Sequence, residues 1–564
     1  MSKKWIIKES ATNPAAIPEY PNLIVKLLAL RGINDADTIR DFLNPDYGKL
    51  HDPFLFKAMQ KAVERIRAAI QNQQKITIYA DYDADAITAC SVLYLALQKL
   101  GAKIEVYIPD RFSEGYGMNI EAVKQIAETN SSLIITVDCG INAAKEVEAA
   151  NLLGLDVIIT DHHELIGELP AALAVINPKN PRDEYPFPYL TGVGVAFKLV
   201  QALFQSGGKR GEGIAEGWEK WLLDLVALGT VADLQSLTGE NRILVSFGLK
   251  VLGKTRWPGL QALLQTASLS AARKLDTFTL GFILAPRINA AGRIKHANIA
   301  FDLLVATDPD VAKKLATELN DLNVHRQNLT EQVISEARAQ IEQASDKKVL
   351  LAVGNDWPKG IVGLVAGKLV EEYNRPVLAL STTEGFATGS GRSVVNFNLV
   401  EALNYAKDLL EKYGGHKQAA GFTLKSANVT AFHQRLLEYA ANTNLADFEQ
   451  VLEIDAEVEG KDLTWENLTF IENMGPFGIG NPKPKFLAKG LVVSDCRLVG
   501  KDGKHFKMRV KFDEHDLEAI AFGQGFLANQ IRPGVKIDAV VELTANEWNG
   551  NKNMELKILD VKVI

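Results

Sequence analysis

The chain has 564 residues, of which 47% are hydrophobic and 23% charged, the composition of a folded, water-soluble protein. Its 62 Lys and Arg residues against 69 Asp and Glu residues give a net charge of −7. This charge excludes an overall basic nucleic-acid-binding coat but leaves room for a local basic surface. Three scattered cysteines exclude a disulfide framework and a Cys-x-x-Cys zinc site, and they favour a reducing cytoplasm. No apolar run suits a signal peptide or a membrane span, so we expect no membrane association.

Residues 1–50 are expected to form a small helical lead-in, and a helical pattern follows at 57–73. Short apolar runs then alternate with helical patterns such as 86–100 and 143–152. The apolar runs are 76–80, 104–108, 133–137 and 157–160. This alternation indicates βαβ units and a mostly parallel sheet.

A single long helix is predicted after this region. There is no glycine between Gly292 and Gly354, Pro309 is the only proline there, and apolar residues follow helical spacing. One helix from Asp310 to about Ala344 would be about 50 Å long and would join two domains. A break in its middle would instead give two helices.

Two further units are expected beyond the helix. Strands at 349–353 and 377–380 around a helix at 361–373 predict a smaller α/β unit, which carries the glycine-rich stretch Gly389–Ser393. From residue 451 the pattern changes to short strands, typical of a small β-barrel of the OB type. These strands are expected at 490–498, 506–512, 517–522, 535–543 and 554–564.

Acidic residues follow three strands of the predicted parallel sheet, namely Asp81, Asp138 and Asp161. Ligands of such sheets bind just beyond the carboxyl ends of the strands. Each aspartate alone is most simply a helix N-cap, but their joint occurrence favours a shared site.

The same segments contain further metal-ligand residue types. Asp81, Asp83 and Asp85 alternate in one turn, His162 and His163 follow Asp161, and Asp233 lies in a later segment. Carboxylate oxygens with imidazole suit Mn²⁺ or Mg²⁺. Four acidic segments at one sheet edge supply enough ligands for two ions, an arrangement that clamps a phosphate and stabilises a leaving oxygen.

Taken in order, these motifs resemble the DHH phosphoesterase superfamily, which is named for the triplet Asp161-His162-His163. Within it they are most similar to the bacterial exonucleases that degrade single-stranded DNA 5′→3′. The matching segments are 81–85, 109–117, 137–140, 160–163, 192–194, 228–233, 285–293, 389–393 and 414–416. The resemblance implies an α/β fold, in which a parallel-sheet DHH domain is joined by the long helix to a smaller α/β DHH-associated domain and an OB-like barrel. The implied boundaries are 1–50 for the lead-in, 51–309 for the DHH domain, 310–345 for the helix, 346–450 for the DHH-associated domain and 451–564 for the barrel.

The resemblance also implies roles for the acidic site. Asp83 would hold one metal ion, Asp85, His162 and Asp233 would hold the other, and Asp138 would bridge the two.

Two further side chains would complete the site. Asp81 would be a ligand or support one, and His163 would orient the scissile phosphate or protonate the leaving oxygen. Ala86 and Pro358 depart from the family pattern, which usually has glycine and histidine there, and no role is carried over to Pro358.

The 5′ end of the DNA would be held by Arg111, Ser390 and Arg392. Arginine offers a forked set of donors that matches phosphate oxygens, and the glycines beside Ser390 would allow close approach. Tyr116 is either a platform for base stacking or a packed core residue. Further expected DNA contacts are Arg287, Asn289, Arg293 and His416.

The predicted barrel has a basic stretch of its own. Residues 481–511 contain nine Lys and Arg residues but only two acids, with aromatic residues between them. This pattern favours single-strand binding over a merely solvated surface. The expected contacts are Lys501, Lys504, Lys507 and Arg509.

The sequence therefore predicts a two-metal phosphodiesterase that degrades single-stranded DNA from the 5′ end to 5′-mononucleotides. It would act in DNA repair and recombination in the bacterial cytoplasm, as a monomer cooperating with a single-strand-binding protein and a helicase. Two alternatives stay open. One is a superfamily relative acting on short RNA or cyclic dinucleotides, and the other is a non-enzymatic scaffold resembling the replication factor Cdc45.

Overall fold

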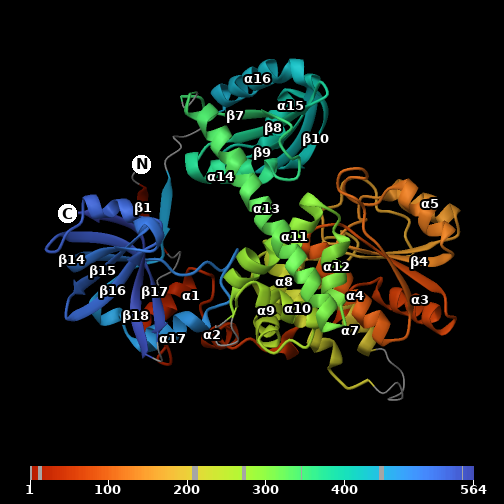
Figure 1. The fold of residues 1–564 in the computed structure, drawn as a ribbon. Coiled ribbons are helices and arrows are strands. Elements are labelled where there is room, and N and C mark those ends of the chain that lie inside the picture. The colour runs from red at the N-terminus through yellow and green to blue at the C-terminus, as the bar shows by residue number, and fades with distance from the viewer. Residues whose placement is uncertain are drawn as a thin grey trace. The chain divides into compact units, whose positions relative to one another are not determined.

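A computed structural model describes the chain in seven segments (Figure 1). These are residues 3–9, 16–205, 214–269, 275–343, 346–443, 450–548 and 551–564. The chain divides into two compact units. The larger unit combines residues 53–233 and 251–449, and the smaller combines residues 1–52, 234–250 and 450–564. Within the described segments, no helix has both the length and the apolar character needed to span a membrane.

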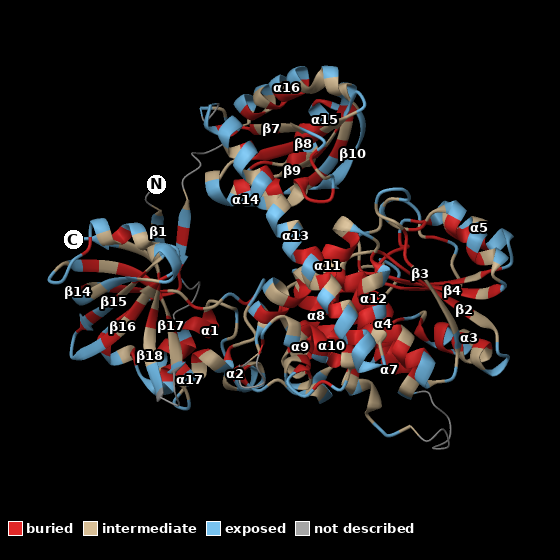
Figure 2. Ribbon diagram, viewed as in Figure 1, coloured by how far each residue is buried: buried red, intermediate tan, exposed pale blue. Residues whose placement is uncertain are grey.

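The first sheet of the larger unit is fully parallel, in the order β3-β2-β4-β5-β6. Its strands are β2 (Lys75–Ala80), β3 (Lys103–Tyr107), β4 (Ser131–Val137), β5 (Asp156–Thr160) and β6 (Ala174–Ile176). Helices α5 (Ile120–Glu128) and α6 (Ala144–Leu152) pack on one face. The other helices against the sheet are α3 (Met59–Gln71), α4 (Ala84–Lys99) and α7 (Gly192–Gln205). Because helices cover the sheet, the central strands are almost wholly buried (Figure 2).

A layer of helices extends this core. Helix α8 (Leu223–Ala232) packs against α4 and ends next to Asp233. It also contacts η4 (Thr279–Leu284), a short π-helical segment that leads into α11 (Ala285–Ile294). The remaining helices of this layer are α10 (Pro258–Thr266) and α12 (Asn298–Val305).

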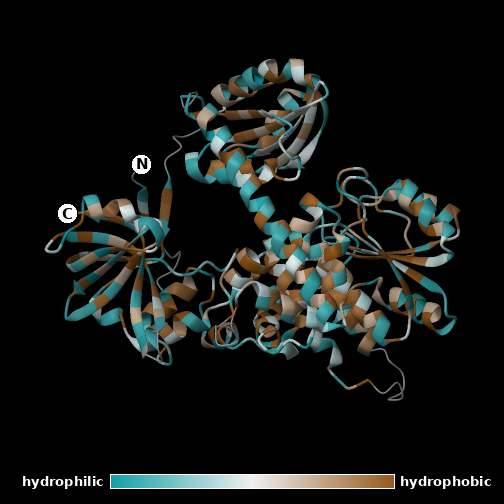
Figure 3. Cartoon of the chain, in the orientation of Figure 1, coloured by the Kyte–Doolittle hydropathy of each residue, from teal (hydrophilic) through white to brown (hydrophobic). Residues whose placement is uncertain are grey.

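The predicted long helix is confirmed as one continuous helix, α13 (Pro309–Glu342), of 34 residues. Asp308 caps it by accepting hydrogen bonds from the backbone N–H groups of Asp310 and Val311. Polar residues cover much of its surface (Figure 3). Its first part packs on α10, α11 and α12, and its last part packs on β7 and α14. Residues 344 and 345, where the sequence placed the helix end, lie outside the described residues.

The second sheet of this unit has the order β10-β11-β9-β8-β7, with a parallel β7–β8 pair and antiparallel neighbours elsewhere. Its elements are β7 (Leu350–Asn355), α14 (Val362–Tyr373), β8 (Val377–Thr383), β9 (Phe386–Arg392), α15 (Leu399–Tyr405), β10 (Leu410–His416), β11 (Ala419–Lys425) and α16 (Val429–Asn442). The glycine-rich stretch that begins at Gly389 therefore lies mostly on a central strand.

The smaller unit contains the predicted barrel. Strands β14 (Phe486–Val499), β15 (His505–Phe512), β16 (His515–Ala521), β17 (Lys536–Trp548) and β18 (Asn551–Val563) pair in a ring that is closed by β14–β17. Also in this unit are β12 (Val451–Ile454), β13 (Ala456–Val458) and α17 (Trp465–Asn473). The predicted fold class is confirmed.

The N-terminal lead-in belongs to the barrel core. Helices α1 (Asn22–Ala29) and α2 (Ala36–Leu43) bury Leu27 and Ile39 in the same apolar cluster as the barrel strands. Strand β1 (Lys4–Ile7) pairs with β12 in a parallel register. The domain boundaries inferred from the sequence stay a prediction.

Candidate metal and phosphate site

The register of the parallel sheet brings three acidic residues to one edge. Ala80 pairs with Val137, and Val137 pairs with Thr160, at the last residues of β2, β4 and β5. The residue that follows each of them is an aspartate, and all three are buried: Asp81, Asp138 and Asp161. The shared edge predicted from the strand ends is therefore present.

The turn after β2 supplies two more carboxylates. Asp83 caps α4, since its Oδ1 accepts hydrogen bonds from the N–H groups of Asp85 (2.9 Å) and Ala86 (3.0 Å). Asp85 lies in the first turn of α4 and is buried. Its two oxygens accept hydrogen bonds from the N–H groups of Gly192 (2.7 Å) and Val193 (2.9 Å), at the start of α7.

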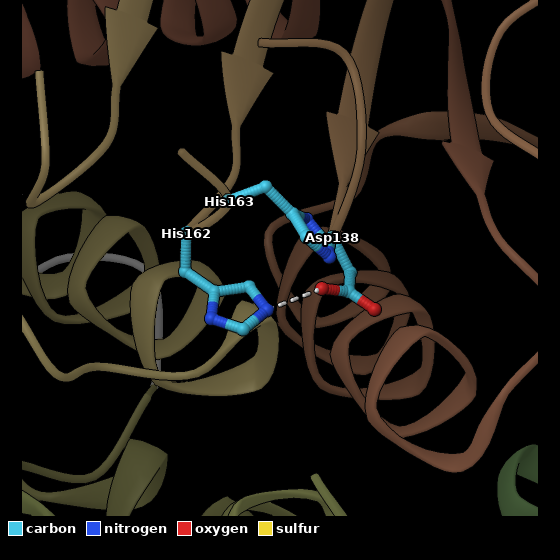
Figure 4. Close-up of side chains that lie close together, drawn as sticks. All are labelled: Asp138, His162 and His163. Atoms are coloured by element: carbon cyan, nitrogen blue, oxygen red, sulfur yellow. Dashed lines mark ion pairs between the residues drawn. The ribbon is translucent and has the colours of Figure 1, made fainter. Parts of the chain in front are cut away.

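His162 is the point where two groups of potential ligands meet. Its Nε2 lies 3.1 Å from Oδ1 of Asp138 (Figure 4). The same atom lies 3.8 Å from Oδ2 of Asp233 and 3.9 Å from Oδ2 of Asp85. Asp138, His162 and His163 form one set of potential ligands, and Asp85, His162 and Asp233 form the other. The second set has the same residues that the resemblance assigned to one ion, whereas Asp83, expected at the other ion, is in neither set.

The electrostatics of this site favour a cation. Burial and the neighbouring charges of Asp85 and Asp83 raise the pKa of Asp138 well above its usual range. Burial and the charge of Asp233 raise the pKa of Asp85 in the same way, and burial with the charge of Asp83 raises the pKa of Asp81 to about 8. Burial lowers the pKa of His162 to about 3, so its imidazole is neutral and able to act as a ligand.

Some polar atoms here lack hydrogen-bond partners among the described residues. They are Oδ1 of Asp81 and Nδ1 of His162, both buried. Buried polar groups are normally satisfied, so exceptions gathered at one place need an explanation. Divalent cations fit these oxygen-rich donors, and they would also relieve the repulsion between the carboxylates.

His163 is oriented by its neighbours. Its Nδ1 lies 2.8 Å from Oδ1 of Asp161, which also accepts hydrogen bonds from the N–H groups of His162 and His163. Burial opposes the charged imidazolium, but the hydrogen bond to Asp161 prevails and raises the pKa of His163. Tyr116 is 57% exposed, and its hydroxyl lies 3.2 Å from Nε2 of His163. The alternative of a packed core tyrosine is therefore wrong.

Two glycines allow helices α7 and α8 to pack against the carboxylates of the site, although sequence reasoning assigned no role to either. A Cβ on Gly192 would lie 2.5 Å from the Asp138 side chain. A Cβ on Gly229 would lie 2.2 Å from Oγ1 of Thr88 and 2.9 Å from Oδ1 of Asp85. Helices α7 and α8 can approach the carboxylates only because both positions lack a side chain.

Two of the three residues expected to hold a 5′ phosphate are in direct contact. Arg392 donates hydrogen bonds from Nη1 to Oγ of Ser390 (2.8 Å) and to the carbonyl of Gly391 (2.9 Å). Arg111 lies after β3 in the DHH region, and its guanidinium stacks over the Tyr82 ring at 4.9 Å.

The glycines beside Ser390 have a packing role, which sequence reasoning missed. A Cβ on Gly389 would lie 2.7 Å from the Phe422 ring, and a Cβ on Gly391 would lie 2.6 Å from Leu399. Close packing in the strand accounts for these glycines without any phosphate.

Two residues of α11 that were expected to contact DNA also form hydrogen bonds within the protein. Arg287 donates hydrogen bonds to Oδ1 of Asn320 and to the carbonyl of Ile283. Asn289 accepts a hydrogen bond from the N–H of Ala84, so it positions the start of α4.

The other two expected contacts lie on or near the second sheet. Arg293, at the end of α11, donates a hydrogen bond from Nη1 to the carbonyl of Gly360 (2.9 Å), in the loop before α14. His416 is exposed at the end of β10.

The basic stretch of the barrel is partly neutralised. Lys507 lies 2.7 Å from Glu518 and 3.7 Å from Glu555, on two neighbouring strands. Lys501, Lys504 and Arg509 are exposed, whereas Lys507 is half-buried. The roles given to individual residues stay predictions.

Three family models match successive parts of the chain. They are the N-terminal domain of the DHH family at residues 75–230, the DHHA1 domain at 346–442 and the RecJ OB domain at 454–560. Fold and site together therefore define a phosphoesterase of the DHH class.

Whole-chain comparisons narrow this class. The single-stranded-DNA-specific exonuclease RecJ of Bacillus subtilis (strain 168) is 43% identical over 545 residues, covering 96% of this chain and 68% of the relative. RecJ of Thermus thermophilus in complex with Mn²⁺ has a TM-score of 0.83 and 30% identity, over 99% of this chain and 79% of that one. The Mg²⁺ complex of the same protein has a TM-score of 0.78 and 29% identity, over 99% and 78%. The chain belongs to the RecJ family.

Proposed function

We propose that this chain is a metal-dependent exonuclease that degrades single-stranded DNA from the 5′ end to 5′-mononucleotides. The observation that carries the proposal is the ligand set Asp85, His162 and Asp233, which lies beside Asp138 at the carboxyl edge of the parallel sheet. The names of its relatives, single-stranded-DNA-specific exonucleases, supply the substrate class. Crystal structures of a relative with Mn²⁺ and with Mg²⁺ support either ion as the cofactor.

Two cations would be held by this chain's own carboxylates. Asp83 would bind one, Asp85, His162 and Asp233 the other, and Asp138 both. Gly192 and Val193 fix Asp85 by backbone hydrogen bonds, so the ligand is in place before an ion arrives. When bound, such a pair of ions supplies a nucleophile at neutral pH and stabilises the charge on the leaving oxygen.

The side chains around the ions have their own tasks. Asp161 fixes the ring of His163 through the contact with Nδ1, and Nε2 then faces the hydroxyl of Tyr116. A protonated Nε2 can donate a hydrogen bond to the scissile phosphate or a proton to the leaving 3′ oxygen. Asp81, buried beside Asp83 at the same edge, would bind a cation or support one of its ligands.

The direction of digestion would come from capture of the 5′ phosphate by Arg111, Ser390 and Arg392. The contact between Arg392 and Ser390 supports a joint role, because both groups then present donors from one place. Tyr116 would stack a base near the reaction centre, which its exposed ring permits. Further phosphate contacts would come from Arg287, Asn289, Arg293 and His416, and from the barrel residues Lys501, Lys504, Lys507 and Arg509.

We further infer a role in DNA repair and recombination in the bacterial cytoplasm. The enzyme would work as a monomer, with a helicase and a single-strand-binding protein supplying the strand.

The test is digestion of a single-stranded DNA oligonucleotide in Mn²⁺, labelled at either end. Stepwise loss from the 5′ end, with a blunt duplex spared, is the expected result. Asp138→Asn is the control for a contaminating nuclease and should be inactive. Digestion from the 3′ end, or hydrolysis of dinucleotides without cleavage of long strands, would contradict the proposal.

A further inference from the structure

Four arginines around the proposed phosphate site have no carboxylate partner among the residues that the structure describes. Arg111, Arg293, Arg326 and Arg392 take part in no ion pair within 4.0 Å among the described residues. Their contacts are neutral groups instead, namely the Tyr82 ring, the Gly360 carbonyl, the Asn323 amide oxygen and the Ser390 hydroxyl. Three of the four belong to the residues expected from the sequence to bind DNA, but Arg326 does not.

The four charges affect one another. Burial lowers the pKa of Arg293 to about 10, and the positive charges of Arg111, Arg326 and Arg392 contribute to this lowering. Asp83 of the metal site acts in the opposite direction on the same residue. Cations gathered in this way without an ion-pair partner repel one another, and an anion bound among them would reduce the repulsion.

The helix geometry directs Arg326 towards the proposed phosphate site. Arg326, Leu329 and Val333 lie on one face of α13, at positions i, i+3 and i+7. Leu329 and Val333 pack in the same apolar cluster as Ile361 and Val362, at the start of α14.

The start of α14 in turn lies against the phosphate residues. A Cβ on Gly363 would lie 3.1 Å from both Oγ of Ser390 and Nη2 of Arg392. On the other side, a Cβ on Gly360 would lie 2.5 Å from the Arg293 carbonyl. The short segment 360–363 therefore contacts the three parts of the structure that carry Arg293, Arg326 and Arg392.

Arg326 has an N–H donor that makes no hydrogen bond to any described residue. Its Nη2 donates a hydrogen bond to Oδ1 of Asn323 (2.9 Å), a residue that is buried one turn earlier. Its Nε is buried and has no hydrogen-bond partner among the residues that the structure describes. A buried donor on a charged group is costly to leave unsatisfied, so an acceptor is expected there when the protein works.

We propose that Arg326, on the connecting helix, is a further specificity residue that binds the terminal 5′ phosphate together with Arg111, Ser390 and Arg392. This inference rests on the proposed function of that site. A terminal phosphomonoester carries more negative charge than an internal diester, close to two charges at neutral pH. An additional arginine therefore raises the preference for a 5′-phosphorylated strand over a 5′-hydroxyl strand.

The experiment compares kcat/KM for two oligonucleotides that differ only in the 5′ phosphate. Arg326→Gln should lower the ratio of kcat/KM, phosphorylated over hydroxyl, by about 10- to 100-fold, because a charge-assisted hydrogen bond is lost. The rate on the 5′-hydroxyl strand should stay close to that of the wild type. Arg338→Gln is the matched control: it lies on the same helix, but it is paired with Glu372 (2.8 Å), and it should leave the ratio unchanged.

An equal loss on both oligonucleotides, or an unchanged ratio, overturns the role of Arg326. Arg326→Lys keeps the positive charge but loses the forked set of donors, so it should give an intermediate ratio. This variant replaces Arg326→Gln in the test if Arg326→Gln lowers the thermal unfolding midpoint. Arg111→Gln reports on the phosphate site as a whole. If it lowers the ratio and Arg326→Gln does not, only this inference fails; if neither does, the proposed phosphate site fails as well.

Discussion

Replacing Gly192 with alanine tests whether the start of α7 sets the geometry of the metal site. The new Cβ would lie 2.5 Å from Cβ and Oδ1 of Asp138, whereas ordinary contact begins at 3.4 Å, so about 0.9 Å must be relieved. Asp138 is poorly able to retreat. Its φ is +59°, in the left-handed region, and its N–H donates a hydrogen bond to the Thr160 carbonyl (3.0 Å).

The alternative is a shift of α7, which also damages the site. The N–H groups of Gly192 and Val193 are the donors that hold Asp85, so moving them displaces a second carboxylate. A misplacement of about 1 Å costs about 100-fold in rate. Overpacking of this kind lowers the free energy of unfolding by about 1–3 kcal/mol.

We therefore expect Gly192→Ala to fold, to lose about 100-fold in kcat and to bind Mn²⁺ more weakly. The assay is kcat on a 5′-phosphorylated single strand at saturating Mn²⁺, with calorimetric titration of Mn²⁺ into the metal-free protein. Gly194→Ala, two residues along the same helix, is the matched control, because its nearest contacts would be at 3.3 Å. Wild-type kcat and Mn²⁺ affinity in Gly192→Ala would refute the reasoning.

Three other predictions follow from the same structure. Tyr116→Ala should raise KM by about 5- to 150-fold through lost stacking, whereas Tyr116→Phe should keep KM near that of the wild type; equal KM values in both variants would remove the stacking role. Mn²⁺ at 100 times its dissociation constant should stabilise the wild type by about 2.7 kcal/mol, seen as a higher thermal midpoint that EDTA reverses; an undiminished rise in Asp138→Asn would argue against Asp138 as a ligand. Burial raises the pKa of Asp224 to about 7 in the folded protein, compared with about 3.9 in the unfolded chain. Between about pH 4 and pH 7 this carboxyl therefore ionises in the unfolded chain but not in the folded protein. The free energy of unfolding falls as pH rises through this range. Asp224→Asn should therefore gain thermal stability relative to the wild type between pH 5 and pH 8, and a pH-independent difference would contradict this sign.

The acidic edge could be predicted because it depends on regular geometry. Buried parallel strands read as short apolar runs, and the residues after paired strand ends must lie side by side. Ala80, Val137 and Thr160 stand in register, so the three aspartates that follow them meet. The long helix was predictable for a similar reason, since a continuous 3.6-residue period without a breaker leaves little alternative.

The contacts that position these carboxylates could not be read from the sequence. Asp85 is held by backbone N–H groups that lie 107 and 108 residues further along the chain. Backbone donors carry no sequence signal, and only the glycine at 192 hints at a close approach. Sequence analysis missed Arg326 for a related reason. Arginines on a polar helix are usually solvated, and only the structure shows that the Nε of Arg326 is buried.

The basic stretch of the barrel shows where counting charges along a sequence misleads. On a sheet, the neighbours of a side chain come from adjacent strands, which are distant in sequence. Lys507 of β15 meets Glu518 of β16 and Glu555 of β18, and neither lies in the stretch that was counted. Cations at the β14–β15 turn have fewer such neighbours: no ion pair within 4.0 Å is found for Lys501 or Lys504 in the described part of the chain. Charge-reversal at this turn should therefore weaken single-strand binding more than Lys507→Glu does, even though all three lysines contribute equally to the sequence count.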